Sequence, residues 1–208
     1  MSIHSSPAWN QEGMTSITCL LLVLISLGLT GGPIEEGPSF LLIDDFTRTD
    51  GRSALGTEWQ TFTDQVMGGV SRGSASRDTL AHRPCLRLRG EVSLENNGGF
   101  VQVALSVRRQ NQPLDAGAFS GIRLTAIGNE ETYYLHLRTG DTRMPWQYYQ
   151  AAFQADGQWR EIDIPFTAFR PANLRAALDP SRIERIGVVA AKKAFNADVA
   201  VARLAFYR

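Results

Sequence analysis

Few side chains in this sequence have the types and spacing that catalysis requires. Beyond residue 38 the only histidines are His82 and His136, and carboxylates are adjacent at Asp44-Asp45 and Glu130-Glu131. A histidine, or two carboxyl groups whose pKa values differ, can act as general acid and base. Adjacent residues of a strand point to opposite faces, however, so neither carboxylate pair is expected to meet in space.

Motifs of several common enzyme classes are absent from the sequence. It contains no His-Glu-x-x-His metal motif, no phosphate-binding loop and no glycine fingerprint of a dinucleotide-binding fold. Cys19 and Cys85 are the only cysteines, and no group of Cys and His has metal-ligand spacing. We therefore expect a protein that is not an enzyme, with no metal site and no cofactor.

One strand and the segment after it carry side chains suited to recognition. If Tyr133, Leu135 and Leu137 face a core, the alternating residues between and after them point outward together. The segment 143–150 adds further aromatic and amide side chains. Aromatic and Arg side chains are enriched at binding surfaces, and aromatic faces stack on sugar rings. The alternative is a set of ordinary strand and core residues. The candidate ligand face consists of Tyr134, His136, Arg138, Trp146 and Tyr148.

The elements that would position this face are strands. From Phe40 onward apolar residues recur mainly at every second position, as in the segments 86–92, 101–107 and 199–206. Strict alternation indicates antiparallel strands with one buried and one solvated face. We therefore predict an all-β, antiparallel jelly-roll β-sandwich over residues 39–208.

Gly, Asn and Asp punctuate these strands. Asn96-Asn97-Gly98-Gly99 lies between two alternating segments and predicts a hairpin, because Asn and Gly tolerate positive φ. Helix is scarce. Asp179-Pro180-Ser181 predicts one short helical turn, with Asp179 as N-cap and Pro180 in the first helical position. The segment 171–178 is a candidate for a second.

The charge balance excludes one class of partner. Lys+Arg and Asp+Glu both total 21, so the formal net charge is zero. Nucleic-acid-binding domains usually carry a basic excess, so no nucleic acid is expected as a partner.

The N-terminal segment is treated apart from the fold. Residues 17–29 are thirteen uncharged, mostly apolar residues, a length typical of a signal peptide and short for a membrane span. Residues 1–16 contain no Lys or Arg, which a signal peptide normally has, and translation from Met14 is an alternative. Residues 1–38 are thus predicted to be a signal peptide or membrane anchor plus a linker. The protein is then membrane-associated or exported to the periplasm, and otherwise cytoplasmic.

The segment from Trp59 to Ser71 has an unusual composition. A Trp is followed by Asp64 and then by Met67-Gly68-Gly69. Paired glycines permit close approach of another segment, or positive φ, and a short acidic side chain can accept backbone N–H bonds across a loop. Two interpretations follow: the loop clamps onto the Asn97-Gly98-Gly99 turn, or it forms part of a partner site.

Taken together, these motifs resemble the complex I intermediate-associated family. The resemblance covers about residues 40–208. A departure is Gly128-Asn129-Glu130-Glu131, where the family often has a Gly-Asp-Gly-Arg-like turn. The motif residues, structural or partner-binding, are Trp59, Asp64, Met67, Gly68, Gly69, Ser71, Asn97, Gly98, Gly99, Phe100 and Trp159, supported by Tyr149, Phe153, Pro165, Phe166, Phe169, Ile183, Ile186, Gly187, Lys193 and Phe195.

The resemblance implies a fold and a function. The fold is a galactose-binding-like jelly roll. Mitochondrial members act as assembly factors that hold intermediates of respiratory complex I, so the implied partners are complex I subunits or assembly intermediates near a membrane. The N-terminal segment is not an Arg-rich presequence, which indicates a bacterial-type relative. The alternative function is an extracytoplasmic carbohydrate-binding module, since jelly rolls of this type often bind sugars on one face.

Overall fold

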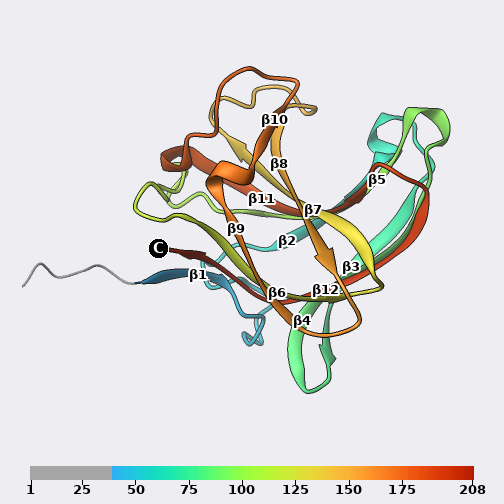
Figure 1. Cartoon of the computed structure of the whole chain (residues 1–208), viewed down its shortest axis with the longest axis horizontal. Helices are drawn as coiled ribbons and strands as arrows, with labels where there is room; N and C mark the ends of the chain where they lie inside the picture. The colour runs from blue at the N-terminus through green and yellow to red at the C-terminus, as the bar shows by residue number, and fades with distance from the viewer. Residues whose placement is uncertain (1–38) are drawn as a thin grey trace, which may run out of the picture. The chain divides into compact units, whose positions relative to one another are not determined.

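Twelve strands and four short 3-10 turns form the described part of the chain, residues 39–208 of the computed structural model. The predicted N-terminal segment and linker lie outside the described residues. Within residues 39–208, no helix has the length and apolar character needed to cross a membrane. The strands pair antiparallel in two six-stranded sheets (Figure 1). The predicted all-β antiparallel sandwich is therefore confirmed.

The first sheet has the order β3-β4-β12-β6-β9, and β1 also pairs with β12. Its longest strand, β12, pairs on one side first with β4 and then with β1, and its register against β6 on the other side shifts between Val201 and Arg203. The strands are β1 (Phe40–Asp44), β3 (Arg72–Leu80), β4 (Arg83–Val92), β6 (Gly121–Gly128), β9 (Arg160–Pro165) and β12 (Phe195–Tyr207).

The second sheet has the order β10-β8-β7-β11-β5-β2. Its centre is β11, which pairs with β7 on one side and with β5 on the other. The strands are β2 (Trp59–Thr63), β5 (Phe100–Ser106), β7 (Glu131–Thr139), β8 (Tyr148–Ala155), β10 (Arg170–Ala172) and β11 (Ile183–Ala191).

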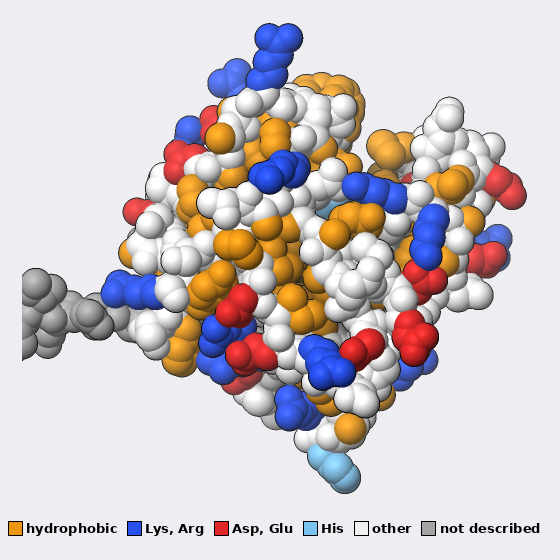
Figure 2. Space-filling model, viewed as in Figure 1, with side chains coloured by type: hydrophobic (Ala, Val, Ile, Leu, Met, Phe, Trp, Pro, Cys, Tyr) orange, Lys and Arg blue, Asp and Glu red, His pale blue; other side chains and the backbone are white. Residues whose placement is uncertain are grey.

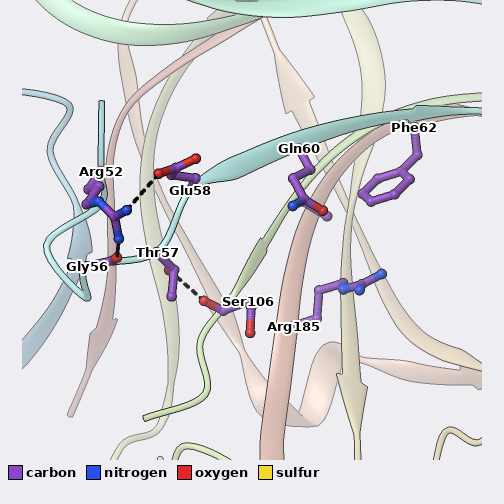
Figure 3. A pocket seen from close by; sticks show the side chains of 9 residues that line it. Arg52, Gly56, Thr57, Glu58, Gln60, Phe62, Ser106 and Arg185 are labelled. Atoms are coloured by element: carbon purple, nitrogen blue, oxygen red, sulfur yellow. Dashed lines mark hydrogen bonds and ion pairs between the residues drawn. The ribbon is translucent and has the colours of Figure 1, made fainter. Parts of the chain in front are cut away.

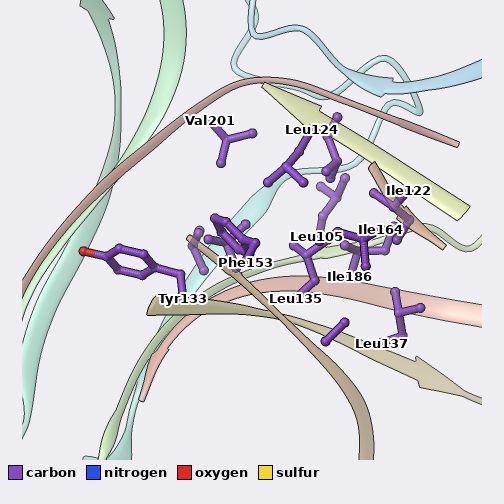
Figure 4. Close-up of a cluster of buried hydrophobic side chains, with 14 of the residues drawn as sticks. Leu105, Ile122, Leu124, Tyr133, Leu135, Leu137, Phe153, Ile164, Ile186 and Val201 are labelled. Carbon is purple, nitrogen blue, oxygen red and sulfur yellow. The ribbon is translucent and has the colours of Figure 1, made fainter. Parts of the chain in front are cut away.

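One core fills the space between the sheets. Leu135 and Leu137 of β7 and Leu124 of β6 belong to one hydrophobic cluster, and each of these side chains is fully buried (Figure 4). The intervening residues of β7 are half-buried and face outward, as the alternation predicted. Each fully buried side chain of this kind contributes about 1.5–3 kcal/mol to stability. The core therefore fixes which face of the second sheet remains available to a ligand.

Two of the local predictions are wrong. The residues Asn96 and Asn97 do have positive φ, but the strands they join do not pair: β4 lies in the first sheet and β5 in the second. The turn is thus a crossing between sheets, which local turn chemistry cannot distinguish from a hairpin. In the segment 171–178, Pro171 belongs to strand β10, which pairs with β8. The turn at Asp179 is confirmed, since its carboxylate accepts the Ser181 N–H at 3.0 Å.

Candidate binding groove

The floor of the groove is the outer face of the second sheet. His136, Gly187 and Ala104 are register partners on three neighbouring strands. Gly187 leaves room for the side chain of Gln102, because a Cβ at Gly187 would lie 2.5 Å from the Gln102 Nε2 atom. The small residues Gly187 of β11 and Ala104 of β5 thus leave space on the sheet surface. The amide of Gln102 and the imidazole of His136 occupy this surface.

Two groups of loops wall this floor. One wall contains the turn η1 (Asp64–Met67) and the crossing 93–99, and the other contains the loop 140–147 with Asn173. They stand at the upper right and the top of Figure 1, and a hollow separates them in Figure 2. The groove has a volume of about 620 Å³. Its lining is Val66, Met67, Leu94, Asn97, Gly98, Gly99, Phe100, Gln102, His136, Pro145, Trp146, Tyr148, Asn173, Ala191 and Lys192.

His136 stacks on Tyr148 at the bottom of the groove. The ring centroids are 4.0 Å apart and the rings are inclined by 13°. Burial, together with the nearby Lys192 ammonium, lowers the pKa of His136 to about 3. Lys192 itself lies 4.4 Å from the centroid of the Tyr134 ring. His136 is therefore neutral at physiological pH, and the floor offers a flat aromatic stack rather than an acid–base pair.

A buried carboxylate holds the wall formed by η1 and the crossing. Asp64 is fully buried and accepts backbone N–H bonds from Ser71 at 2.9 Å, Gly99 at 2.6 Å and Phe100 at 3.3 Å. The Ser71 hydroxyl also donates to Asp64 and accepts the Ser93 N–H at 2.9 Å. Although burial alone would raise the pKa of Asp64, these hydrogen bonds hold it below the ordinary value. One ionised carboxylate thus joins two loops that are distant in the sequence.

The glycines around Asp64 have two different roles. Gly68 and Gly99 have φ of 90° and 131°, a region that side chains other than Gly rarely adopt. A Cβ at Gly69 would lie 2.3 Å from the Asp64 Cγ atom, and one at Gly98 would lie 2.5 Å from Oδ2. Gly69 is therefore needed for close approach, and of the Gly68-Gly69 pair only Gly68 has positive φ.

The groove unites residues from both sets predicted from the sequence. Met67, Asn97, Gly98, Gly99 and Phe100 come from the family motif, and His136, Trp146 and Tyr148 come from the candidate ligand face. Asp64, Gly69 and Ser71 lie directly behind the wall that η1 and the crossing 93–99 form. Tyr134 lies beside the groove under Lys192.

Three predicted site residues lie elsewhere. Arg138 points outward from β7 but turns to the next loop, where it donates to the carbonyl oxygens of Thr142 at 2.8 Å and Met144 at 3.0 Å. Trp59 donates its indole N–H to Asp44 at 2.8 Å. Trp159 packs under Arg83, whose guanidinium carbon is 5.9 Å from the ring centroid. The two tryptophans are outside the groove.

Several groove residues were not predicted. Gln102 occupies an outward position of an alternating strand, so the alternation itself contained the signal that singles it out. Val66 and Leu94 are large apolar residues in loops, with exposed fractions of 73% and 52%. Lys192 follows β11 at a positive φ of 77°, and no local sequence signal marks it.

The site contains no catalytic constellation among the described residues. Residues 69–73 match the Gly-x-Ser-x-Gly spacing of a hydrolase nucleophile turn, but Ser71 is fully buried and leads into a strand, not a helix. Its hydroxyl contacts Asp64 and the Ser93 backbone, with no histidine partner. Within residues 39–208, no three His, Cys, Asp or Glu side chains cluster to hold a metal. The arrangement is suited to binding.

Solved structures with a similar fold include carbohydrate-binding modules. The family 11 module of the cellulosomal cellulase Lic26A-Cel5E of Clostridium thermocellum has a TM-score of 0.62 at 15% identity, covering 81% of this chain and 94% of that one. The same kind of module from Clostridium thermocellum, in complex with a β-1,3-1,4-mixed-linked tetrasaccharide, has a TM-score of 0.63 at 13% identity, over 81% and 95%. Identities this low show a shared fold alone.

A part of a much larger enzyme is also similar. An agarase has a TM-score of 0.53 at 12% identity, covering 82% of this chain and 24% of that chain. A search of curated proteins finds no match.

A sequence model described as complex I intermediate-associated protein 30 (CIA30) matches residues 45–199, which include the Asp64 loop and most of both sheets. The chain belongs to the complex I intermediate-associated protein 30 family.

Proposed function

We propose that this chain is a non-catalytic binding protein that holds a partner polypeptide during the assembly of respiratory complex I, and that it does so through the groove. Membership of the complex I intermediate-associated protein 30 family supports the assembly role. The meeting of the family-motif loops with the aromatic floor supports the choice of surface.

The observation that carries this proposal is the exposed apolar rim. Val66, Met67, Leu94 and Trp146 have exposed fractions between 52% and 73%, and all four line the groove. Exposed apolar residues that gather around a concavity mark a surface for a partner. Flexible Met and Leu side chains adapt to apolar side chains of a polypeptide, whereas sugar sites depend on rigid aromatic faces with converging polar groups.

Genetic complementation tests this function. We expect deletion of the gene in its native organism to reduce fully assembled complex I on native gels and to increase subcomplexes. Wild-type protein and Phe40→Ala should restore assembly, because Phe40 is exposed but lies outside the groove. The double variant Met67→Ser/Trp146→Ala should not restore it. Normal complex I in the deletion strain, or rescue by the groove variant, would reject the proposal.

A second candidate is carbohydrate binding, favoured by the polar groups next to the aromatic stack. The amide side chains of Gln102 and Asn173 line the groove together with the stacked rings of His136 and Tyr148. Amide groups beside stacked rings suit the hydroxyl groups of a sugar, because they can both donate and accept hydrogen bonds. Calorimetric titration with a β-1,3-1,4-mixed-linked tetrasaccharide tests it. Binding that Tyr148→Ala removes would favour this candidate over the first, and no binding would leave it without support.

A further inference from the structure

A second cavity lies on the same face of the sheet as the groove. It has a volume of about 220 Å³ and is lined by Ser106, Arg108, Arg138, Thr142, Glu184 and Arg185. Arg138 is two residues beyond His136 on β7, so the cavity begins roughly 7 Å from the aromatic floor. An extended ligand chain that fills the groove therefore reaches it without a bend.

Two arginines on neighbouring strands line this cavity. Arg185 of β11 is the register partner of Arg138 of β7, and both are half-buried. Like charges placed directly opposite on neighbouring strands destabilise a sheet. Burial and the neighbouring Arg185 lower the pKa of Arg138. The pair thus concentrates positive charge on the floor of a protein with zero formal net charge.

No carboxylate of residues 39–208 forms an ion pair with either arginine. Arg138 donates to the neutral oxygen atoms of Thr142 and Met144. The Arg185 guanidinium lies 5.5 Å from the centroid of the Phe62 ring, and Figure 3 shows it reaching into the open space beside Phe62 and Gln60. The acidic residue that lines this cavity, Glu184, pairs instead with Arg108 at 3.6 Å.

The surroundings favour a singly charged anion. Two guanidinium groups can hold a carboxylate through short charge-assisted hydrogen bonds. Glu184 lines the same cavity, so a doubly charged phosphate would meet more repulsion there than a carboxylate would. The neighbouring groove supplies apolar contacts to whatever carries the anion.

We propose that Arg138 and Arg185 bind the carboxylate of an acidic side chain on the same polypeptide whose apolar side chains fill the groove. This rests on the proposed function and specifies the partner: an extended segment with apolar residues and an Asp or Glu two to four positions away. Side chains on one face of an extended chain repeat every second residue, which matches the spacing between the groove and the arginine pair.

Selection of displayed peptides tests this pairing. A library of randomised nine-residue peptides is sorted on the immobilised full-length protein, and recovered sequences are counted for Asp or Glu at that spacing from apolar residues. We expect the wild type to enrich such sequences about tenfold over Arg185→Gln. Arg185→Lys retains the charge without the planar fork and should give an intermediate enrichment. The control Arg160→Gln, which removes an exposed arginine paired with Asp156, should match the wild type.

The possible outcomes distinguish a failure of the carboxylate site from a failure of the proposed function. Enrichment of apolar peptides without an acidic preference overturns the carboxylate site and leaves the groove intact. No enrichment by the wild type rejects both. Binding of polygalacturonate that is lost in Arg185→Gln, without peptide enrichment, assigns the arginine pair to an acidic polysaccharide and overturns the polypeptide ligand. Equal melting temperatures for the variants confirm that differences arise from the site.

Discussion

The backbone N–H of Gly99 donates to the Oδ2 atom of Asp64 across 2.6 Å, although the two residues are 35 positions apart. The same carboxylate binds Ser71, so it fixes the loop after β2 to the crossing that leads into β5. These two segments form one wall of the groove. The shape of the wall thus depends on a fully buried residue that does not itself line the groove.

Replacement of Asp64 by Asn tests this dependence. The Asp64→Asn variant would keep the size of the side chain but bring an NH₂ group against backbone donors, so we expect a loss of about 2–4 kcal/mol in the free energy of unfolding. Urea denaturation at pH 7 measures it. The control Asp163→Asn removes an exposed carboxylate paired with Arg123 and should cost less than about 1 kcal/mol. Equal losses for the two variants would show that Asp64 is not the anchor.

Replacement of Gly98 by Ala tests the close approach separately from the charge. The added methyl group would lie 2.5 Å from Asp64 Oδ2, so something must shift, and we expect a cost of about 1–3 kcal/mol. Gly157→Ala is the matched control, since nothing lies within 4 Å of a Cβ there and its φ is not positive. Thermal unfolding compares the two. If both glycines accept Ala without loss, the packing of the crossing onto Asp64 is looser than the structure indicates.

The half-buried imidazole of His136 predicts a dependence of stability on pH. Its pKa in the folded protein, about 3, lies below the ordinary 6.5, so the unfolded state binds the proton more tightly. The stabilisation is complete above pH 6.5 and is lost as the pH falls toward 3. Between about pH 7 and pH 5 the wild type should lose about 1–2 kcal/mol more than His136→Gln. Urea titrations at both pH values give the difference, and parallel losses would contradict the assignment.

Alternation along the chain was sufficient to predict the strands, because one core side chain at every second position leaves little freedom in register. Leu135 and Leu137 are buried as predicted, and His136 between them faces outward. Which strands pair with one another was harder to predict from the sequence. Asn96 and Asn97 adopt the positive φ that their types favour, yet this local preference is equally compatible with a hairpin and with a crossing between sheets.

The candidate site was predictable only in its parts. The motif loops and the aromatic face were identified separately, and their meeting in one groove depends on strand order, which the sequence does not encode locally. Lys192 and the pairing of Arg185 with Arg138 follow from the central position of β11. A sequence pattern reports which face a residue takes, but not which strand will lie beside it.

The central strands of both sheets come late in the described chain. Strand β11 separates β7 from β5, and β12 separates β4 from β6. During synthesis on the ribosome the earlier strands emerge first, at about 5–20 residues per second. Their edges that later pair with β11 and β12 remain unpaired until these two strands have emerged. The groove floor cannot exist until β11 has left the exit tunnel. Nascent chains therefore pass through a period in which the edges of β5 and β7 are unpaired and no partner can yet bind in the groove.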